Sequence, residues 1–197
     1  MDEKIQETLK ETINQISSID DEIWGEIIEK AILKNYKKKE HIVENNTVCD
    51  FIGILIEGYV RAYSIDEKGV DRTIYFNYLP NFPIISEYES YITGNKSKIN
   101  IQAITDTKVV IIKKDILDKL FLKNIQIERL GRLISEKLYL EALIRIRLLQ
   151  TTKAEERYAN LIKNNPNIVN NVQDYMIASY LGVTSSSFSK IKRKYFK

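Results

Sequence analysis

The sequence predicts an α+β protein in which helices flank a compact β-rich region and a helix-turn-helix lies near the C-terminus. Three observations support this prediction. Apolar residues at helical spacing dominate both ends, short β-rich runs separated by turns fill residues 41–113, and a two-helix pattern occupies residues 174–193. Of the 197 residues, 44% are hydrophobic and 29% charged, which is typical of a soluble globular protein with one sizeable domain and a smaller one.

The first two thirds of the chain change from a helical to a β pattern. Apolar spacing predicts helix over residues 2–35, with a new helix start at residues 18–22. The alternating runs from residue 41 to 113, with a hairpin turn at 66–69, are typical of a sandwich or small barrel. Residues 80–95 fit neither a strand nor a regular linker, and we expect a short helix and a loop there, as the lid or floor of a ligand site.

A long helical pattern begins at Asp115, and its part after Gln126 runs for about two dozen residues without proline. Its apolar residues lie on more than one face, so the helix needs two apolar partners. One is the β-rich region, and the other is most simply the same helix of a second subunit in a two-stranded coiled coil. Burial of both faces within one chain remains the alternative. Thr151 and Thr152 mark a joint before the next helix.

The C-terminal stretch has a suitable residue at each constrained position of a helix-turn-helix. Gly182 can supply the positive φ that the turn requires, and Thr184 can cap the second helix. The apolar positions of both helices face one small core: Ile177, Leu181, Phe188 and Ile191. The opposite face of the second helix is polar and basic: Ser185, Ser186, Ser189, Lys190, Arg193 and Lys194. This helix suits a DNA major groove, although other amphipathic helix pairs joined at a glycine would look similar.

The distribution of charge favours DNA binding over that alternative. From Lys153 onward, eight basic residues, Lys197 included, outnumber three acidic ones, which gives this segment a net charge of +5. The whole chain carries only +3, so the part before Lys153 is slightly acidic. After Asp174 the sequence has no acidic residue. A basic end on an otherwise acidic protein is what contact with DNA phosphates requires.

Several other classes of protein are excluded by what the sequence lacks. Cys49 is the one cysteine and His41 the one histidine, which excludes a disulfide framework, a four-cysteine iron–sulfur cluster and a histidine-rich metal site. Neither a dinucleotide-binding glycine motif nor a phosphate-binding loop occurs. No apolar run is long enough for a membrane span, and the first residues do not resemble a signal peptide. We therefore expect a cytoplasmic protein without metal or cofactor, in which Cys49 has no assigned role.

The order of these segments resembles the bacterial family of the cyclic-AMP receptor protein and the fumarate–nitrate reduction regulator (Crp/Fnr). The resemblance covers nearly the whole chain, and four stretches carry it: residues 36–44, residues 51–63 with Glu57 and Gly58, the turn at 66–69, and residues 174–193. It implies a cyclic-nucleotide-binding-like β-roll (a double-stranded β-helix), a homodimer, and transcription control by effector-dependent repositioning of the DNA-binding domains, with RNA polymerase as a further partner. It divides the chain into N-terminal helices and β-roll sensor domain (1–114), dimerisation helix (115–150) and a winged-helix-like helix-turn-helix domain (151–197).

The residues at the family's effector site depart from its cyclic-nucleotide pattern. Family members that bind cyclic nucleotides have a Gly-Glu pair for the ribose and an Arg-Ser/Thr pair for the cyclic phosphate. The matching positions here carry Ser86 and Glu87, and then Ser97 and Lys98. Without a bidentate guanidinium the phosphate loses its main counter-charge, so we do not expect cyclic AMP to bind. These four residues remain the candidate site for an unidentified small effector.

The resemblance also assigns roles within the second helix of the helix-turn-helix. The family's base-contacting positions fall on Ser185, Ser186 and Lys190, and the lysine can donate to guanine. We expect the capping Thr184 to belong to the DNA-binding surface as well, and phosphate contacts from Ser187, Ser189, Lys192, Arg193 and Lys194. A wing strand would have to come from residues before Gln173, such as residues 168–169.

These observations favour a homodimeric DNA-binding transcription regulator whose β-roll senses an effector. A second hypothesis is a regulatory or scaffold module whose helix-turn-helix contacts protein, which the serine-rich, arginine-poor surface suggests. A third, an enzyme on a cupin-like barrel, would need several histidine and carboxylate ligands. With a single histidine and no nucleophile–base pair, we predict no catalytic residues and no enzymatic activity.

Overall fold

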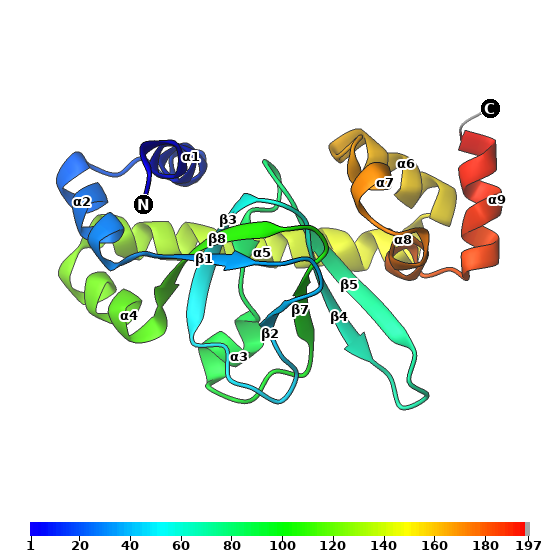
Figure 1. The fold of residues 1–197 in the computed structure, drawn as a ribbon, viewed down its shortest axis with the longest axis horizontal. Helices are drawn as coiled ribbons and strands as arrows, with labels where there is room; N and C mark the ends of the chain where they lie inside the picture. The colour runs from blue at the N-terminus through cyan, green and yellow to red at the C-terminus, as the bar shows by residue number, and fades with distance from the viewer. Residues whose placement is uncertain (196–197) are drawn as a thin grey trace.

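The computed structural model describes residues 1–195 and is elongated around one long helix, α5 (Ile125–Thr151). The β-strands lie against the middle of α5, the N-terminal helices lie at one end, and the C-terminal helices lie at the other (Figure 1). Of the nine helices within the described range, the first four are α1 (Glu3–Asn14), α2 (Asp21–Lys30), α3 (Tyr88–Thr93) and α4 (Lys114–Lys123). After α5 follow α6 (Ala154–Asn164), α7 (Ile168–Asn171), α8 (Asp174–Leu181) and α9 (Ser185–Tyr195).

Two antiparallel four-stranded sheets form the β-roll, with strand orders β1-β8-β3-β6 and β2-β7-β4-β5. The strands are β1 (Ile32–Tyr36), β2 (His41–Val43), β3 (Phe51–Glu57), β4 (Val60–Ile65), β5 (Asp71–Asn77), β6 (Ile84–Ile85), β7 (Asn100–Ala103) and β8 (Thr107–Lys113). The inner faces of the two sheets pack on each other through fully buried side chains that include Leu55, Val60 and Ile101. The predicted hairpin turn is present, since Asp66 Oδ1 accepts from the backbone of Lys68 and Val70.

The predicted N-terminal helical region extends too far, because its last residues form the strand β1. The chain leaves helical geometry at Ala31, and β1 pairs with β8 in the register Ile32 to Ile111. Residues 32–35 have helical apolar spacing, but the open edge of β8 offers them a ladder of backbone hydrogen bonds, and this tertiary pairing overrides a weak local preference.

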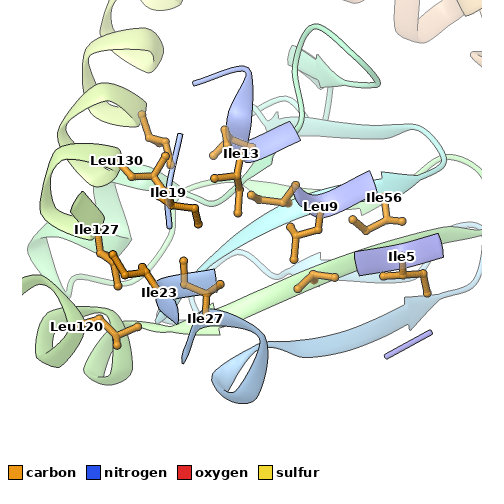
Figure 2. Close-up of a cluster of buried hydrophobic side chains, with 14 residues drawn as sticks. Ile5, Leu9, Ile13, Ile19, Ile23, Ile27, Ile56, Leu120, Ile127 and Leu130 are labelled. Carbon is orange, nitrogen blue, oxygen red and sulfur yellow. The ribbon is translucent and has the colours of Figure 1, made fainter. Parts of the chain in front are cut away.

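The N-terminal helices and the first half of α5 share one apolar core, shown in Figure 2. Ile5, Leu9 and Ile13 follow at four-residue intervals along α1 and are all buried. They pack together with residues of β3 and with Ile127 and Leu130 of α5. This packing provides the first of the two apolar partners that the long helix needs.

The long helical pattern is divided in two at Asn124. This residue has extended geometry (φ −138°), and its Oδ1 accepts from Gln126 N at 2.9 Å, so it ends α4 and caps α5. Over the second half of α5 most of the large apolar residues are exposed: Tyr139 65%, Leu140 57%, Leu143 44%, Ile144 46%, Ile146 52% and Leu149 45%. One chain therefore leaves this apolar face uncovered.

The C-terminal helices pack around a second core that includes Tyr158, Ile168 and Ile177, all fully buried. The expectation of a wing strand at residues 168–169 is wrong, because these residues begin α7. Ile168 is part of the core, and its carbonyl accepts from Val172 N, which closes a helical turn. Across residues 1–195, none of the helices combines the length and apolar character that crossing a bilayer requires.

Candidate nucleic-acid interface and effector region

The turn between α8 and α9 has the geometry that the sequence predicts. Gly182 has a φ of 72°, in the left-handed region, and Val183 N donates to Ala178 O at 3.0 Å, which closes the turn at the end of α8. Thr184 Oγ1 accepts from Ser187 N at 3.2 Å and caps the first turn of α9. The two helices are therefore joined tightly, and the second begins at Ser185.

The core of the helix-turn-helix fixes which face of α9 points outward. Ile177, Leu181 and Phe188 are fully buried, and Ile191 is nearly so. The ring of Phe188 meets Tyr158 of α6 edge-on, with centroids 5.1 Å apart. Because the apolar side of α9 is held in this core, its serine-rich and basic side faces away from the protein.

The predicted DNA-contacting residues form one exposed surface, except for Lys192, which is half-buried. The hydroxyls at its start bond to one another: Thr184 Oγ1 lies 3.0 Å from both Ser186 Oγ and Ser187 Oγ. Further along, Ser189 Oγ donates to Ser185 O at 2.9 Å. The first turn of α9 is thus a layer of small polar groups that allows a close approach of another molecule.

The basic residues of α9 divide into two groups. Lys192 Nζ lies 2.8 Å and 3.0 Å from the carboxylate oxygens of Asp174, so its charge is already paired across the turn. Within residues 1–195, Lys190, Arg193 and Lys194 are exposed and form no ion pair. Sequence reasoning missed this pairing, although Asp174 is the acidic residue that begins the helix-turn-helix. Lys197, which counted toward the basic charge, lies outside the described residues.

The candidate effector residues lie around α3, and Glu87 is the residue that caps the start of this helix. Its side chain is buried, and its two carboxylate oxygens accept from the backbone of Glu89 at 3.2 Å and Ser90 at 2.9 Å. These bonds cap α3. The carboxylate therefore uses the backbone donors at the start of this short helix for the protein's own structure.

Ser86 lies beside Glu87, and its side chain joins the wall of the β-roll. Ser86 Oγ donates to Phe51 O at 3.0 Å, and Cys49 Sγ lies 3.6 Å from the same hydroxyl. Tyr75 OH donates to Ser86 O at 3.3 Å. Burial raises the pKa of Tyr75, and the nearby negative charge of Glu87 adds to this effect, so the phenol stays a neutral donor. The alternating pattern of β5 could have indicated this inward-facing tyrosine.

Ser97 and Lys98 do not converge with Glu87 on a shared site. Ser97 is buried, and its Oγ donates to Ile99 O at 2.7 Å within its own loop. Lys98 points outward and forms an ion pair with Glu89 at 2.6 Å. Neither residue offers an uncompensated cation in the place where the resemblance puts an arginine. Two surface hollows among the described residues, around residues 20–26 with 123–126 and around residues 148–163 with Tyr195, lie outside the β-roll.

The fold defined by these sheets, the long helix and the C-terminal helix-turn-helix is that of the Crp/Fnr transcription regulators. FixK2 from Bradyrhizobium japonicum has 23% sequence identity over 83% of each chain, with a TM-score of 0.68. A transcriptional regulator assigned to the Crp/Fnr family, from Eubacterium rectale, has 17% identity over 90% of this chain and 83% of its own, with a TM-score of 0.67. The c-di-GMP-responsive global regulator CLP from Xanthomonas campestris has 12% identity over 89% of this chain and 91% of its own, also at 0.67.

At sequence identities of 12–23%, the similarity to these solved structures establishes the fold alone. No protein-family model matches the sequence, and no curated protein matches it either.

Proposed function

We propose that this protein is a homodimeric transcription regulator of the Crp/Fnr family that binds DNA through α9. The observation that carries the proposal is the exposed face of α9, where Lys190, Arg193 and Lys194 form no ion pair with any carboxylate of residues 1–195 while the opposite side is held in the core. A helix presented in this way can enter a major groove, with base contacts from Ser185, Ser186 and Lys190. RNA polymerase is the partner, and the cytoplasm the location, that such a role implies.

Dimerisation through α5 is the second part of the proposal. The exposed apolar residues on the second half of α5 include Leu140 and Leu143, which are 57% and 44% exposed in one chain. A parallel pairing of two such helices would bury this face, as in a coiled coil. The dimer would present two copies of α9, so a near-palindromic DNA site is expected.

The third part concerns the effector, and we propose that neither cyclic AMP nor another phosphate-bearing nucleotide regulates this protein. Three features support this. Glu87 already holds the backbone donors of α3, Lys98 is paired with Glu89, and Ser97 bonds within its loop. A phosphate placed there would meet the carboxylate of Glu87 without a compensating cation. If an effector exists, it is uncharged or cationic.

The test is fluorescence anisotropy of the purified protein on a random duplex library and on promoter-derived duplexes, across a salt series. Two copies of Arg193 and Lys194 supply about four phosphate contacts, so log K should fall with log salt at a slope of about −4 or steeper. A palindromic site should emerge from the library. Absence of binding at low salt by folded, dimeric protein would instead support the scaffold alternative, in which the helix-turn-helix contacts protein.

The effector proposal has its own measurement in the same assay. Adding cyclic AMP or c-di-GMP should leave the DNA affinity unchanged, and neither should shift the melting temperature. Glu87→Ala should lower stability by about 1 kcal/mol through loss of the cap of α3 while DNA affinity is retained. A nucleotide-dependent gain in affinity that Glu87→Ala abolishes would contradict the proposal.

A further inference from the structure

The back of α8, opposite the DNA-binding surface, is held by two different parts of the chain. One is the edge strand β5 of the β-roll, and the other is the long helix α5 (Figure 1). The apolar core of the C-terminal helices continues into the β-roll through Phe76, Tyr78 and Ile104. The helix-turn-helix is therefore packed onto the rest of the molecule rather than suspended from a linker.

Ser179 connects α8 to the free edge of β5. Its Oγ accepts from Thr73 N at 2.9 Å and donates to Asp71 O at 3.3 Å. β5 is the last strand in its sheet, so these two backbone groups have no neighbouring strand on that side. A single hydroxyl thus supplies both the donor and the acceptor that this part of the strand edge would otherwise lack.

Arg145 connects α8 to the long helix. Its guanidinium donates to Tyr180 O and lies over the Tyr180 ring, 3.8 Å from the centroid. The same ring packs on Phe76 of β5, with centroids 5.2 Å apart. A cation on a carbonyl in the last turn of a helix is also favoured by the helix dipole. Tyr180 is therefore held by α5 on one side and by the β-roll on the other.

The covalent connection alone does not fix this arrangement. Helix α5 ends at Thr151, residues 152–153 are extended, and α6 begins at Ala154, so two non-helical residues join the long helix to the DNA-binding helices. Arg157 braces this joint, since it donates to Thr152 O and to Leu181 O. Among the hydrogen bonds of the described residues, Arg145 links α8 to α5 and Ser179 links α8 to β5.

We propose that Arg145 and Ser179 are positioning residues that set the distance between the two copies of α9, and so the half-site spacing that a dimer recognises. Each added base pair between half-sites moves the second by about 3.4 Å and turns it by roughly 35°. A rigidly held pair of helices must therefore discriminate between spacings. This inference rests on the proposed dimeric DNA-binding function, but it concerns geometry and not the residues that touch DNA.

The experiment compares DNA binding by the wild type, Arg145→Ala, Ser179→Ala and the double variant. Each protein is titrated against duplexes whose half-sites are separated by the preferred spacing or by two base pairs more or fewer, and against a single half-site. We expect the wild type to favour its preferred spacing by about tenfold or more, which is about 1.4 kcal/mol, and the double variant to lose most of that preference. Half-site affinity should stay within about twofold, which also reports that the helix-turn-helix is folded.

Conservative and control variants separate positioning from general destabilisation. Ser179→Thr keeps the hydroxyl and should keep the preference, whereas Arg145→Lys keeps the charge without the planar group over Tyr180 and should restore it only in part. Arg147→Ala removes a basic residue two positions along α5 that is exposed and whose side chain donates no hydrogen bond to the described part of the helix-turn-helix. This control should behave as the wild type.

A measurement without DNA tests the mechanical part of the inference, that Arg145 and Ser179 hold the C-terminal helices against the rest of the molecule. Nitroxide labels at Lys68→Cys in the β4–β5 hairpin and Lys163→Cys in α6, both exposed positions, report the distance between the β-roll and the C-terminal helices. Native Cys49 is 1% exposed and is replaced by alanine in this background. The wild type should give a narrow distance distribution, and the double variant a broad one.

The outcomes are distinct. If the double variant keeps both the narrow distribution and the spacing preference, the inference is wrong although DNA binding stands. The same holds if the distribution broadens while the spacing preference persists. If the wild type binds neither spacing series nor half-site, the proposed function fails and this inference fails with it, whatever the distance distribution.

Discussion

Gly58, in the turn between β3 and β4, provides a quantitative test of the β-roll geometry. Its φ is 106°, and a Cβ added there would lie 2.5 Å from Thr107 Oγ1 and 2.7 Å from Asp106 O. Gly69, in the β4–β5 turn, has a φ of 76°, but a Cβ there would meet nothing within 4 Å. The two glycines therefore share the positive φ and differ in the space around them.

The expected free energies of unfolding follow from this difference. An L-residue in left-handed geometry costs about 1–2 kcal/mol, which applies to both Gly58→Ala and Gly69→Ala. Forcing a methyl group into a packed site costs a further 1–3 kcal/mol or so, and this applies to Gly58→Ala alone because the obstructing atoms include backbone. The loss of unfolded-state freedom is the same in both variants and cancels. We expect Gly58→Ala to be the less stable by about 1–3 kcal/mol.

Urea unfolding followed by the fluorescence of Trp24 measures this difference. Trp24 is the one tryptophan of the chain and packs against the N-terminal core that contains residues of β3. Both variants should unfold with the slope of the wild type, so that the midpoints report stability. Equal midpoints for the two variants would refute the reasoning, because they would mean that the turn at Gly58 is not packed against Thr107 as described.

Three further predictions concern the interface, the DNA contact and pH. Leu143→Glu should convert the dimer to monomers in sedimentation velocity while the monomer stays folded, because Leu143 is 44% exposed in one chain; a dimer that persists would place the interface elsewhere. Lys190→Ala should weaken binding to the selected site by about 1–3 kcal/mol and relax specificity at one position in the anisotropy assay, against little change on random DNA. Partial burial raises the pKa of Glu141 in the folded protein, while the nearby charge of Lys137 opposes this shift. Because the folded state then holds this proton more tightly than the unfolded state does, the fold loses stability as pH rises through the folded-state pKa. Glu141→Gln should therefore raise the melting temperature at pH 7 and have no effect near pH 4; a gain that is the same at both pH values would contradict the assignment.

The helix-turn-helix could be predicted residue by residue because its constraints are local. A turn that needs positive φ calls for glycine at Gly182, a helix start calls for the hydroxyl of Thr184, and a small shared core calls for apolar residues such as Phe188. Each requirement involves residues within a few positions of one another. The spacing of residue types therefore carries nearly all of the information.

The effector region could be predicted only in outline, since its chemistry depends on the direction of side chains. The sequence placed Glu87 beside a short helix, which is where it lies, but it could not indicate that the carboxylate turns back to cap that helix. Nor could it indicate that Lys98 pairs outward with Glu89. The strand β1 was missed for a related reason: its partner β8 lies more than 70 residues further along the chain.

The apolar core that α1 shares with α5 has a consequence for the order in which the chain can fold. Ile5 and Leu9 complete their packing only with residues such as Ile127 and Ile134, which the ribosome adds more than a hundred positions later. At about 5–20 residues per second, the first helix waits on the order of 5–20 s for this partner. During that time its apolar face is open to chaperones and to other nascent chains. The C-terminal helices, whose contacts are mostly local, have no such delay, so the N-terminal half of the molecule should be the half that aggregates when synthesis is interrupted.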